Sequence, residues 1–350
     1  MTTLLEQFRS WIQKRANEQQ YFSGTFWFLF SARSEADFIH ALGLEPAQHF
    51  AVPSVNHSRT VAVEKRTGTT LKATFHQLPI QHETVRVLFS LEKPKHALRP
   101  MYHLLAKTRG AVNLFPFGHP LMRECARLTS NISLENVRVI RGVSYPSPPN
   151  EGGADINLKP GNAATFFAKV EDEKRVLKTV TFQVPVEDHV SSCQFKIGRS
   201  GYLTYQSGPF GPLLELISEK LPAQLANSVR PFERAKGHYV QFQFSEPLFL
   251  QPSNYQIVVD ALSRLPRTSI ALLHTNPYFH AALTNYEDGG EFDIFITGHS
   301  TIHIRGQGDV SPASFLRLQN GLTEQFQDAR VSLEQPGREH SFKDLIEGRV

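Results

Sequence analysis

Histidine most invites a search for chemistry in this chain, because 15 of the 350 residues are histidines. The candidate metal-ligand pairs are His76/His82, His274/His280 and His299/His303. Residues four apart on a strand share a face but lie about 13 Å apart by strand rise, although a turn at 298–301 would change the last distance. We therefore expect structural or solvent-facing histidines and predict no metal site.

Clustered carboxylates with a lysine would indicate a metal-dependent nuclease. The nearest approach is Asp155 with the run Glu171-Asp172-Glu173-Lys174, but residues 170–175 read better as a charged hairpin turn. The pairs Glu187-Asp188 and Glu287-Asp288 lie 100 positions apart, and turn formation, in which Asp bonds its own backbone, explains them without catalysis. The sequence therefore predicts no catalytic residue.

Motifs for the common enzyme chemistries are absent. The chain has no Walker A loop, GxGxxG, HExxH, CxxC or GxSxG sequence, so phosphate, dinucleotide, zinc and nucleophile-elbow signatures are all missing. We expect no cofactor, and the sequence favours a non-catalytic protein.

Basic residues give the more economical functional hypothesis. The net charge is +4 and the pI is near 9.0, which fits a polyanionic partner or a simple solubility margin. Arg and Lys on a sheet reach phosphates, and aromatic residues contact bases. The candidate nucleic-acid contacts are Lys174, Arg175, Lys178, Lys196, Arg199, His299, His303 and Arg305. Each of these side chains has a plainer interpretation as part of a solvated surface.

An internal repeat positions these residues. Residues 187–216 and 287–316 match without a gap at an offset of 100. The identical pairs are Glu187/Glu287, Asp188/Asp288, Phe195/Phe295, Gly198/Gly298, Ser200/Ser300, Pro212/Pro312 and Leu216/Leu316. They predict a turn, a strand, a tight turn with a glycine at positive φ and a helix that starts at proline. The apolar alternation of the two copies is shifted by one residue, which exchanges the two faces of a strand.

Patterning predicts a chain of mixed elements. We expect helices at 3–18, 34–44, 96–108, 121–128, 212–225, 255–265 and 312–326. We expect strands at 21–30, 60–75 (a hairpin), 85–91, 137–144, 166–170, 178–184, 193–197, 202–205, 239–244, 269–274, 280–285, 292–296 and 301–305. Residues 145–153, rich in Pro and Gly, form a loop or a linker.

The second copy has a recognisable order of elements, namely strand, helix, four strands and helix. Its segment Glu291–Gly306, leading into Ser311-Pro312, resembles the TATA-box-binding-protein-like fold. The resemblance implies an opening strand, a short helix, a curved antiparallel sheet and a long closing helix in each of two tandem repeats. The first copy departs from this pattern, with a Pro/Gly-rich loop in place of the short helix, and no functional residue is carried over from the family.

The fold class that we predict is α+β, with tandem antiparallel-sheet repeats and packed helices plus an N-terminal α+β domain. The predicted parts are an N-terminal domain at 1–130, a first repeat at 131–232, a second repeat at 233–330 and a polar tail at 331–350. Two cysteines cannot form a disulfide framework, and no window approaches ~18 apolar residues. We expect a soluble, cytoplasmic protein without a membrane partner.

Three functions remain open at this stage. The leading one is a non-catalytic protein that binds DNA or RNA on curved sheets, alone or inside a nucleic-acid-handling complex. The second is an assembly subunit that binds other protein subunits. The third is an enzyme or a small-molecule sensor with a pocket between sheet and helices.

Overall fold

The computed structural model divides the chain into two compact units, Met1–Ala226 (unit 1) and Asn227–Val350 (unit 2). The structure describes residues 4–18, 22–47, 52, 55–80, 82–108, 110–130, 133–145, 156–158, 160–173, 175–186, 191–233, 239–245, 247–251, 254–265, 267–275, 278–296, 298–308, 310–326 and 330–333. Each unit is a mixed α+β structure built on an antiparallel sheet, so the predicted fold class is confirmed at this level.

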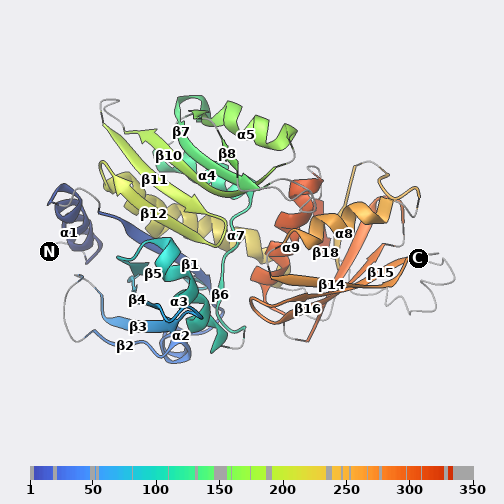
Figure 1. The fold of residues 1–350 in the computed structure, drawn as a ribbon, viewed down its shortest axis with the longest axis horizontal. Coiled ribbons are helices and arrows are strands. Elements are labelled where there is room, and N and C mark those ends of the chain that lie inside the picture. The colour runs from blue at the N-terminus through green and yellow to red at the C-terminus, as the bar shows by residue number, and fades with distance from the viewer. Residues whose placement is uncertain are drawn as a thin grey trace. The chain divides into compact units, whose positions relative to one another are not determined.

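Unit 1 holds one large sheet with the strand order β2-β3-β4-β5-β1-β12-β11-β10-β7-β8, while β6 pairs with β1 and β9 with β7 (Figure 1). Its strands are β1 (Gly24–Phe30), β2 (Glu45–Pro46), β3 (His57–Glu64), β4 (Thr70–Gln77), β5 (Val85–Ser90), β6 (Asn113–Leu114), β7 (Arg138–Tyr145), β8 (Ile156–Leu158), β9 (Gly161–Asn162), β10 (Val176–Pro185), β11 (Ser192–Gly198) and β12 (Tyr202–Ser207). Strands from both sides of the predicted boundary at residue 130 thus share a single sheet.

Helices connect and cover this sheet. They are α1 (Leu4–Glu18), α2 (Glu35–Leu42), α3 (Pro94–Ala106), α4 (His119–Ser130), α5 (Ala163–Asp172), α6 (Gly211–Glu215) and α7 (Leu221–Glu233), with a 3₁₀ turn at Leu134–Asn136 and a π-helical stretch at Leu216–Lys220 between α6 and α7. The starts of α2 and α5 follow the expected physics, because Ser34 and Asn162 each accept a hydrogen bond from a backbone N–H of the first turn.

The two faces of the sheet are covered by different helices. Neighbouring residues Thr25 and Phe26 of β1 point to opposite sides, and we name the faces after them. The Thr25 face carries a core that joins Trp27 and Leu29 to Phe38 of α2 and Met101 of α3. The Phe26 face is covered by the other helices.

Aromatic contacts define the covering of the Phe26 face. The ring of Phe8 in α1 lies 6.2 Å from that of Phe26, and the ring of Phe210, directly before α6, lies 5.9 Å from it. Farther along the same face, Phe167 of α5 stacks at 6.2 Å on Phe182 of β10. Over β10–β12 the helices therefore lie on the face opposite to the one that α2 and α3 cover.

One predicted strand is wrong. Residues 166–170 belong to α5, whose buried residues Ala163, Phe166, Phe167 and Val170 follow the i, i+3, i+4, i+7 spacing of a helix. Adjacent phenylalanines suggested a strand, but the Asn162 cap and this spacing favour the helix. Residues 170–173 accordingly end a helix instead of forming a hairpin turn. The predicted first repeat thus has a helix between β7 and β10, where the sequence indicated a loop and a strand.

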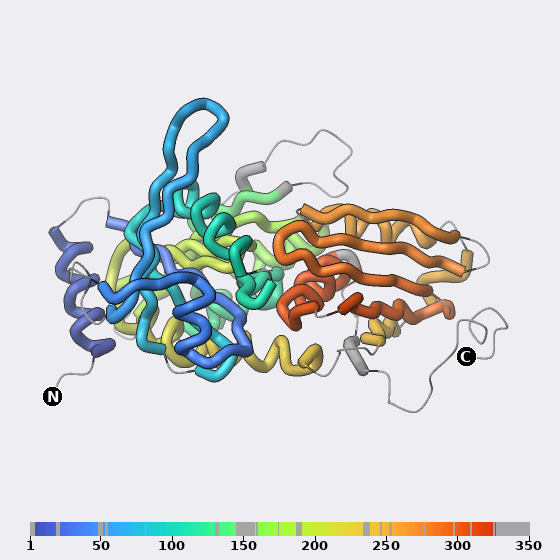
Figure 2. The backbone as a smooth tube through the Cα atoms, turned by 90° about the horizontal axis from the view of Figure 1, so that it is seen from below, coloured from blue at the N-terminus to red at the C-terminus, as the bar shows by residue number. Residues whose placement is uncertain are grey.

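Unit 2 has the strand order β14-β15-β16-β17-β13-β18. The strands β14 to β17, in shades of orange, lie side by side in Figure 2. Its elements are β13 (Tyr239–Gln243), α8 (Tyr255–Ser263), β14 (Thr268–His274), β15 (Phe279–Asn285), β16 (Gly290–Ile296), β17 (Thr301–Gln307), α9 (Pro312–Gln325) and β18 (Arg330–Leu333). The predicted order of strand, helix, four strands and helix is confirmed, and so is the cap of α9 by Ser311. The strand β18 was not predicted.

The closest topological match to unit 2 lies at the start of unit 1. The series β1-α2-β2-β3-β4-β5-α3 has the same order of elements as β13-α8-β14-β15-β16-β17-α9, and in both the opening strand lies beside the last strand of the meander. The segment at 187–216 shares only the closing part, in which two strands lead to a helix with proline in its first turn.

The structure explains why the apolar alternation of the two predicted repeat copies is shifted by one residue. In β11 the buried side chains are Cys193, Phe195 and Ile197, and in β16 the corresponding set is Phe292, Ile294 and Ile296. Their partners agree, since Ile197 pairs with Leu203 and Ile296 with Ile302. The strands therefore correspond at an offset of 99 positions, whereas the prolines correspond at 100.

Glycine conformations differ from expectation in the two tight turns. At Gly198 and Gly298 the φ angle lies outside the +20° to +160° range, so the predicted positive φ is wrong for both. The β11–β12 turn places it at Gly201 instead, with φ of +73°. A Cβ at Gly201 would meet the backbone carbonyl oxygen of Phe115. The turn lies close to this segment because the N–H of Phe28 donates to the carbonyl oxygen of Gly201, and the N–H of Phe117 donates to that of Arg199.

A buried ion-pair network stabilises unit 2 and explains one of the acidic pairs. Arg317 of α9 lies 2.6 Å from Glu287 and 3.9 Å from Asp288, with side chains 7%, 9% and 3% exposed. Asp288 also accepts the N–H of Gly290 at 3.0 Å, and Asn285 accepts a bond from Arg317 at 3.2 Å. Asp288 thus makes the backbone bond that turn chemistry predicted, whereas the ion pairs with Arg317, which fix the β15–β16 turn to α9, were not predicted. Glu187 and Asp188 lie outside the described residues.

Gly201→Ala should destabilise unit 1 far more than Gly68→Ala. Both residues have positive φ, but Gly68 has no atom within 4 Å of a Cβ position. We expect a loss of about 1 kcal/mol for Gly68→Ala and about 3 kcal/mol for Gly201→Ala, where steric overlap is added. Urea unfolding followed by tryptophan fluorescence measures this, because the chain's two tryptophans, Trp11 and Trp27, both lie in unit 1. Equal losses would contradict the close approach at Gly201.

Arg317→Met should destabilise unit 2 by about 3–5 kcal/mol, because it leaves two buried carboxylates without their cation. The unfolding transition seen by far-UV circular dichroism should shift, while the tryptophan transition of unit 1 stays in place. The double variant Arg317→Met/Glu287→Gln should recover part of the loss. An unchanged circular dichroism transition would show that the network contributes nothing.

Candidate nucleic-acid interface

A row of polar side chains crosses the Thr25 face of unit 1. Directly opposed residues of neighbouring strands point to the same side of a sheet, and the registers of β7, β10, β11, β12, β1 and β5 align one such series. This polar row consists of Arg141, Thr181, Lys196, Thr204, Thr25 and Ser90. Apolar residues fill the equivalent positions on the other face, where Phe182, Phe195 and Tyr205 face each other.

Hydroxyl groups at one end of the polar row are buried and satisfied. The Oγ1 atoms of Thr25 and Thr204 lie 3.4 Å apart, and Thr25 Oγ1 donates to the carbonyl oxygen of Glu92 at 3.1 Å. Ser90 donates its hydroxyl to the Glu92 carboxylate. This end of the row is part of the interior of the sheet and offers no free group to a ligand.

The other end of the polar row is basic. Lys196 is half-buried, and its pKa is lowered first by burial and then by the positive charges of Arg141 and Lys178. No carboxylate is among the causes of this shift. Within the described part of the chain, Lys196 Nζ has no hydrogen bond or ion pair. A cation that is desolvated beside other cations favours the arrival of an anion.

The nucleic-acid contacts that were predicted in the first repeat differ in their surroundings. Lys178 and Lys196 lie close enough for the charge of Lys178 to lower the pKa of Lys196. Arg199 is next to them in the sheet, since its backbone N–H donates to the carbonyl oxygen of Lys178 at 3.0 Å. Arg175 has a structural role, since its Nε donates to Ser144 Oγ at 2.9 Å and Glu173 lies 3.7 Å away. Lys174 lies outside the described residues.

Sequence reasoning missed Arg141. The strand at 137–144 was predicted, but its basic residues Arg138 and Arg141 were not considered as ligand contacts. Both side chains are exposed, and they face Gln183 and Thr181 across the sheet. Only the register of β7 against β10 shows that Arg141 belongs to the same row as Lys196, and a β-bulge between Thr181 and Phe182 sets that register.

The predicted contacts of the second repeat lie in unit 2. His299 is tied to a neighbouring loop, where its Nδ1 is 3.2 Å from the carbonyl oxygen of Phe249. His303 and Arg305 lie on β17, opposite Phe295 and Asp293 of β16. The guanidinium carbon of Arg305 lies 5.7 Å from the ring centre of Tyr239 on β13.

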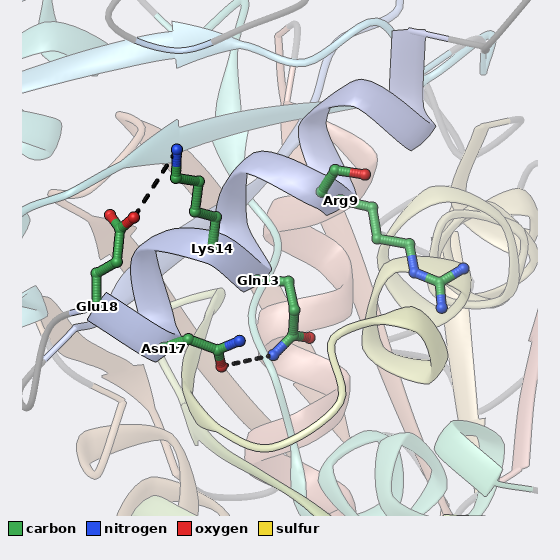
Figure 3. Close-up of a pocket in the computed structure, with 6 residues that line it drawn as sticks. Arg9, Gln13, Lys14, Asn17 and Glu18 are labelled. Atoms are coloured by element: carbon green, nitrogen blue, oxygen red, sulfur yellow. Dashed lines mark hydrogen bonds and ion pairs between the residues drawn. The ribbon is translucent and has the colours of Figure 1, made fainter.

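A hollow along α1 has no features of a binding site (Figure 3). Its wall is the polar side of a single helix. Gln13 is structural, since it donates to the carbonyl oxygen of Gly208 at 3.3 Å and accepts the N–H of Phe210 at 2.9 Å, which fixes α1 to the start of α6. Lys14 pairs with Glu18 at 3.8 Å, as the dashed line in Figure 3 shows.

Other reactive groups give no sign of catalysis. Cys125 and Cys193 are buried, which raises the pKa of the Cys125 thiol and raises that of Cys193 to about 12. Thiols of this kind are poor nucleophiles. Among the described residues, no group of three or more His, Cys, Asp or Glu side chains is placed to hold a metal ion, and no helix is long and apolar enough to cross a membrane.

Comparison with known proteins adds no assignment. No protein-family model matches the chain, and no curated protein matches its sequence significantly.

Lys196→Met should leave unit 1 as stable as before or slightly more stable. The folded-state pKa of Lys196 is lowered, so its charge is unfavourable below that pKa, and the penalty disappears as pH rises through it. At neutral pH we expect the melting temperature to rise by about 2 °C, because solvent screening keeps the effect below about 1 kcal/mol. Thermal unfolding followed by tryptophan fluorescence tests this, with Lys72→Met on β4 as the matched control. A clear fall for Lys196→Met would assign the lysine a structural role.

Proposed function

We propose that this protein is a non-catalytic nucleic-acid-binding protein, and that the basic end of the polar row on unit 1 contacts the phosphate backbone. The observation that carries the proposal is Lys196, a half-buried cation whose pKa is lowered by burial, Arg141 and Lys178, with no carboxylate of the described residues among the causes. Such an arrangement costs stability in the free protein and is relieved by a bound anion. A nucleic acid supplies several phosphates at regular spacing.

The geometry of the row supports a polymer over a single small anion. Cations come from separate strands, with Arg141 on β7, Lys178 on β10 and Lys196 on β11, so they are spread across the sheet. Threonine hydroxyls such as that of Thr181 lie between them in the row, and hydroxyl groups are common partners of phosphate oxygens.

We extend the proposal to the fold. The resemblance to the TATA-box-binding-protein-like fold implies an opening strand, a short helix, an antiparallel sheet and a closing helix. Two segments have this order of elements, β1 to α3 and β13 to α9. The repeat of that fold would accordingly fall at 24–106 and 239–325, and the resemblance remains one of topology.

A second candidate function is an assembly subunit that binds protein. It is favoured by β14, an edge strand of unit 2 without a charged residue, on which Leu272 and Leu273 are 48% and 55% exposed. Exposed apolar edge strands pair readily with strands of other chains.

Binding to fluorescently labelled 20-nucleotide DNA and RNA, titrated at increasing salt, tests the proposal. We expect affinity to fall as salt rises, with the slope of log K against log salt decreasing by about 0.7–0.9 for Lys196→Met and again for Arg141→Gln, since each removes one phosphate contact. Lys72→Met is the control for loss of a surface charge. The proposal fails when the wild-type dissociation constant at low salt is weaker than ~10⁻⁴ M or does not depend on salt.

A further inference from the structure

The sheet of unit 2 has an outward surface whose side chains differ in chemistry from the basic end of the polar row on unit 1. Alternate residues of β13, β16 and β17 point away from α8 and α9, while Val240, Ile294 and Ile304 point toward them and are buried. We name the outward surface the Tyr239 face. Its central residues are Tyr239, Gln241, His280, Asp293, Phe295, His303 and Arg305.

Comparison of the two topological copies shows that this surface has a distinct chemistry. The Tyr239 face corresponds to the Phe26 face of unit 1, because in each copy the connecting helices cover the opposite side. On β1 and β5 that face bears Phe26 and Phe89, which are fully buried under Phe8 of α1 at ring distances of 6.2 and 5.2 Å. A helix thus covers the first copy, and the face beneath it is apolar on β1 and β5, with the imidazole of His76 on β4 beside Phe89 at a ring distance of 6.4 Å.

In the second copy the corresponding strands carry amphipathic groups. β13 bears Tyr239 and Gln241, and β17 bears His303 and Arg305. An amide, an imidazole and a guanidinium would be poor neighbours for the apolar side of a helix such as α1, because burial without partners costs each of them free energy. The surface therefore suits a ligand that is planar and polar.

Rings dominate this surface. Phe295 lies in its middle, with the His280 ring stacked at 4.1 Å and 17° and the Tyr239 ring at 6.0 Å and 72°. The His303 ring lies 6.3 Å from that of Tyr239. Clustered aromatic rings and imidazoles on a sheet are the groups on which unpaired bases stack.

Arg305 supplies the complementary charge. The carboxylate opposite it in the register, that of Asp293, is already engaged by His280 Nε2 at 3.4 Å and by the amide of Gln307. Among the described residues, the side chain of Arg305 has no ion pair or hydrogen bond, and its guanidinium carbon lies 5.7 Å from the centre of the Tyr239 ring. Its charge is available to a phosphate that neighbours a stacked base.

We propose that the Tyr239 face binds unpaired bases of a single-stranded nucleic acid, with stacking on Tyr239 and a phosphate contact from Arg305. This inference rests on the proposed function and narrows it, because a base paired inside a duplex does not offer its faces to side chains. Unit 1 contacts phosphate of either strandedness, and unit 2 selects the single strand.

The test compares one 20-nucleotide single strand with its duplex by fluorescence anisotropy on the full chain. Tyr239→Ala/Arg305→Gln should weaken single-strand binding at least tenfold, as expected for a lost stacking contact worth about 1–3 kcal/mol, and should change duplex binding less than twofold. Tyr239→Phe should retain single-strand affinity. Arg66→Gln, at the exposed tip of the β3–β4 hairpin, is the control for a lost charge.

Chemical modification of the unaltered protein gives an independent measure. Carbethoxylation of His280 and His303 should slow when the single strand is added and stay unchanged with the duplex. Unprotected histidines, or equal losses of single-strand and duplex affinity in the double variant, would overturn the inference. The proposed function then still stands if Lys196→Met weakens both ligands, whereas wild-type protein that binds neither ligand overturns the function itself.

Discussion

The pairing of β1 with β12 is the interaction on which the architecture of unit 1 depends. Through it the strands of residues 24–90 and those of residues 138–207 form one sheet, with Thr25 opposite Thr204 and Trp27 opposite Tyr202. These two pairs lie on the face where α2 and α3 pack, whereas Phe26 faces Leu203 on the other side. Without this junction the polar row would end at β12, and the two helix layers would have no common sheet.

Placing helices on opposite faces has a direct consequence for binding. Where α4, α5 and α6 cover the Phe26 face, the Thr25 face over β7, β10 and β11 is left to polar side chains, and Lys196 lies there beside other cations. Under the proposed function, stability and binding would oppose each other at this position, since the charge that disfavours the free protein is the one that would attract an anion. In unit 2 the face turned away from α8 and α9 bears rings beside Gln241, Asp293 and Arg305, so the two units would offer a polynucleotide different chemistry.

Two segments of the chain share one topology but differ in their surfaces. Both segments insert the opening strand beside the last strand of the meander, and in both the middle hairpin of the meander, β3–β4 or β15–β16, contains a glycine with positive φ, Gly68 or Gly289. The difference lies in what covers the remaining face. The first copy buries it beneath Phe8 of α1, and in the second copy Tyr239 and Arg305 occupy the corresponding strands.

Local pattern alone determined most elements of this protein, because caps, turns and apolar periodicity act over a few residues. Ser34, Gly68 and Ser311 placed their helix starts and hairpin correctly, whereas the Phe166-Phe167 pair was misread because adjacent aromatic residues fit a strand or a helix and only packing decides. Lys178, Lys196 and Arg305 were recognisable as candidates from charge. Arg141 and Tyr239 were not, because their roles depend on register between strands that are far apart in the sequence. The tertiary structure decided which strands meet, and therefore which side chains share a face.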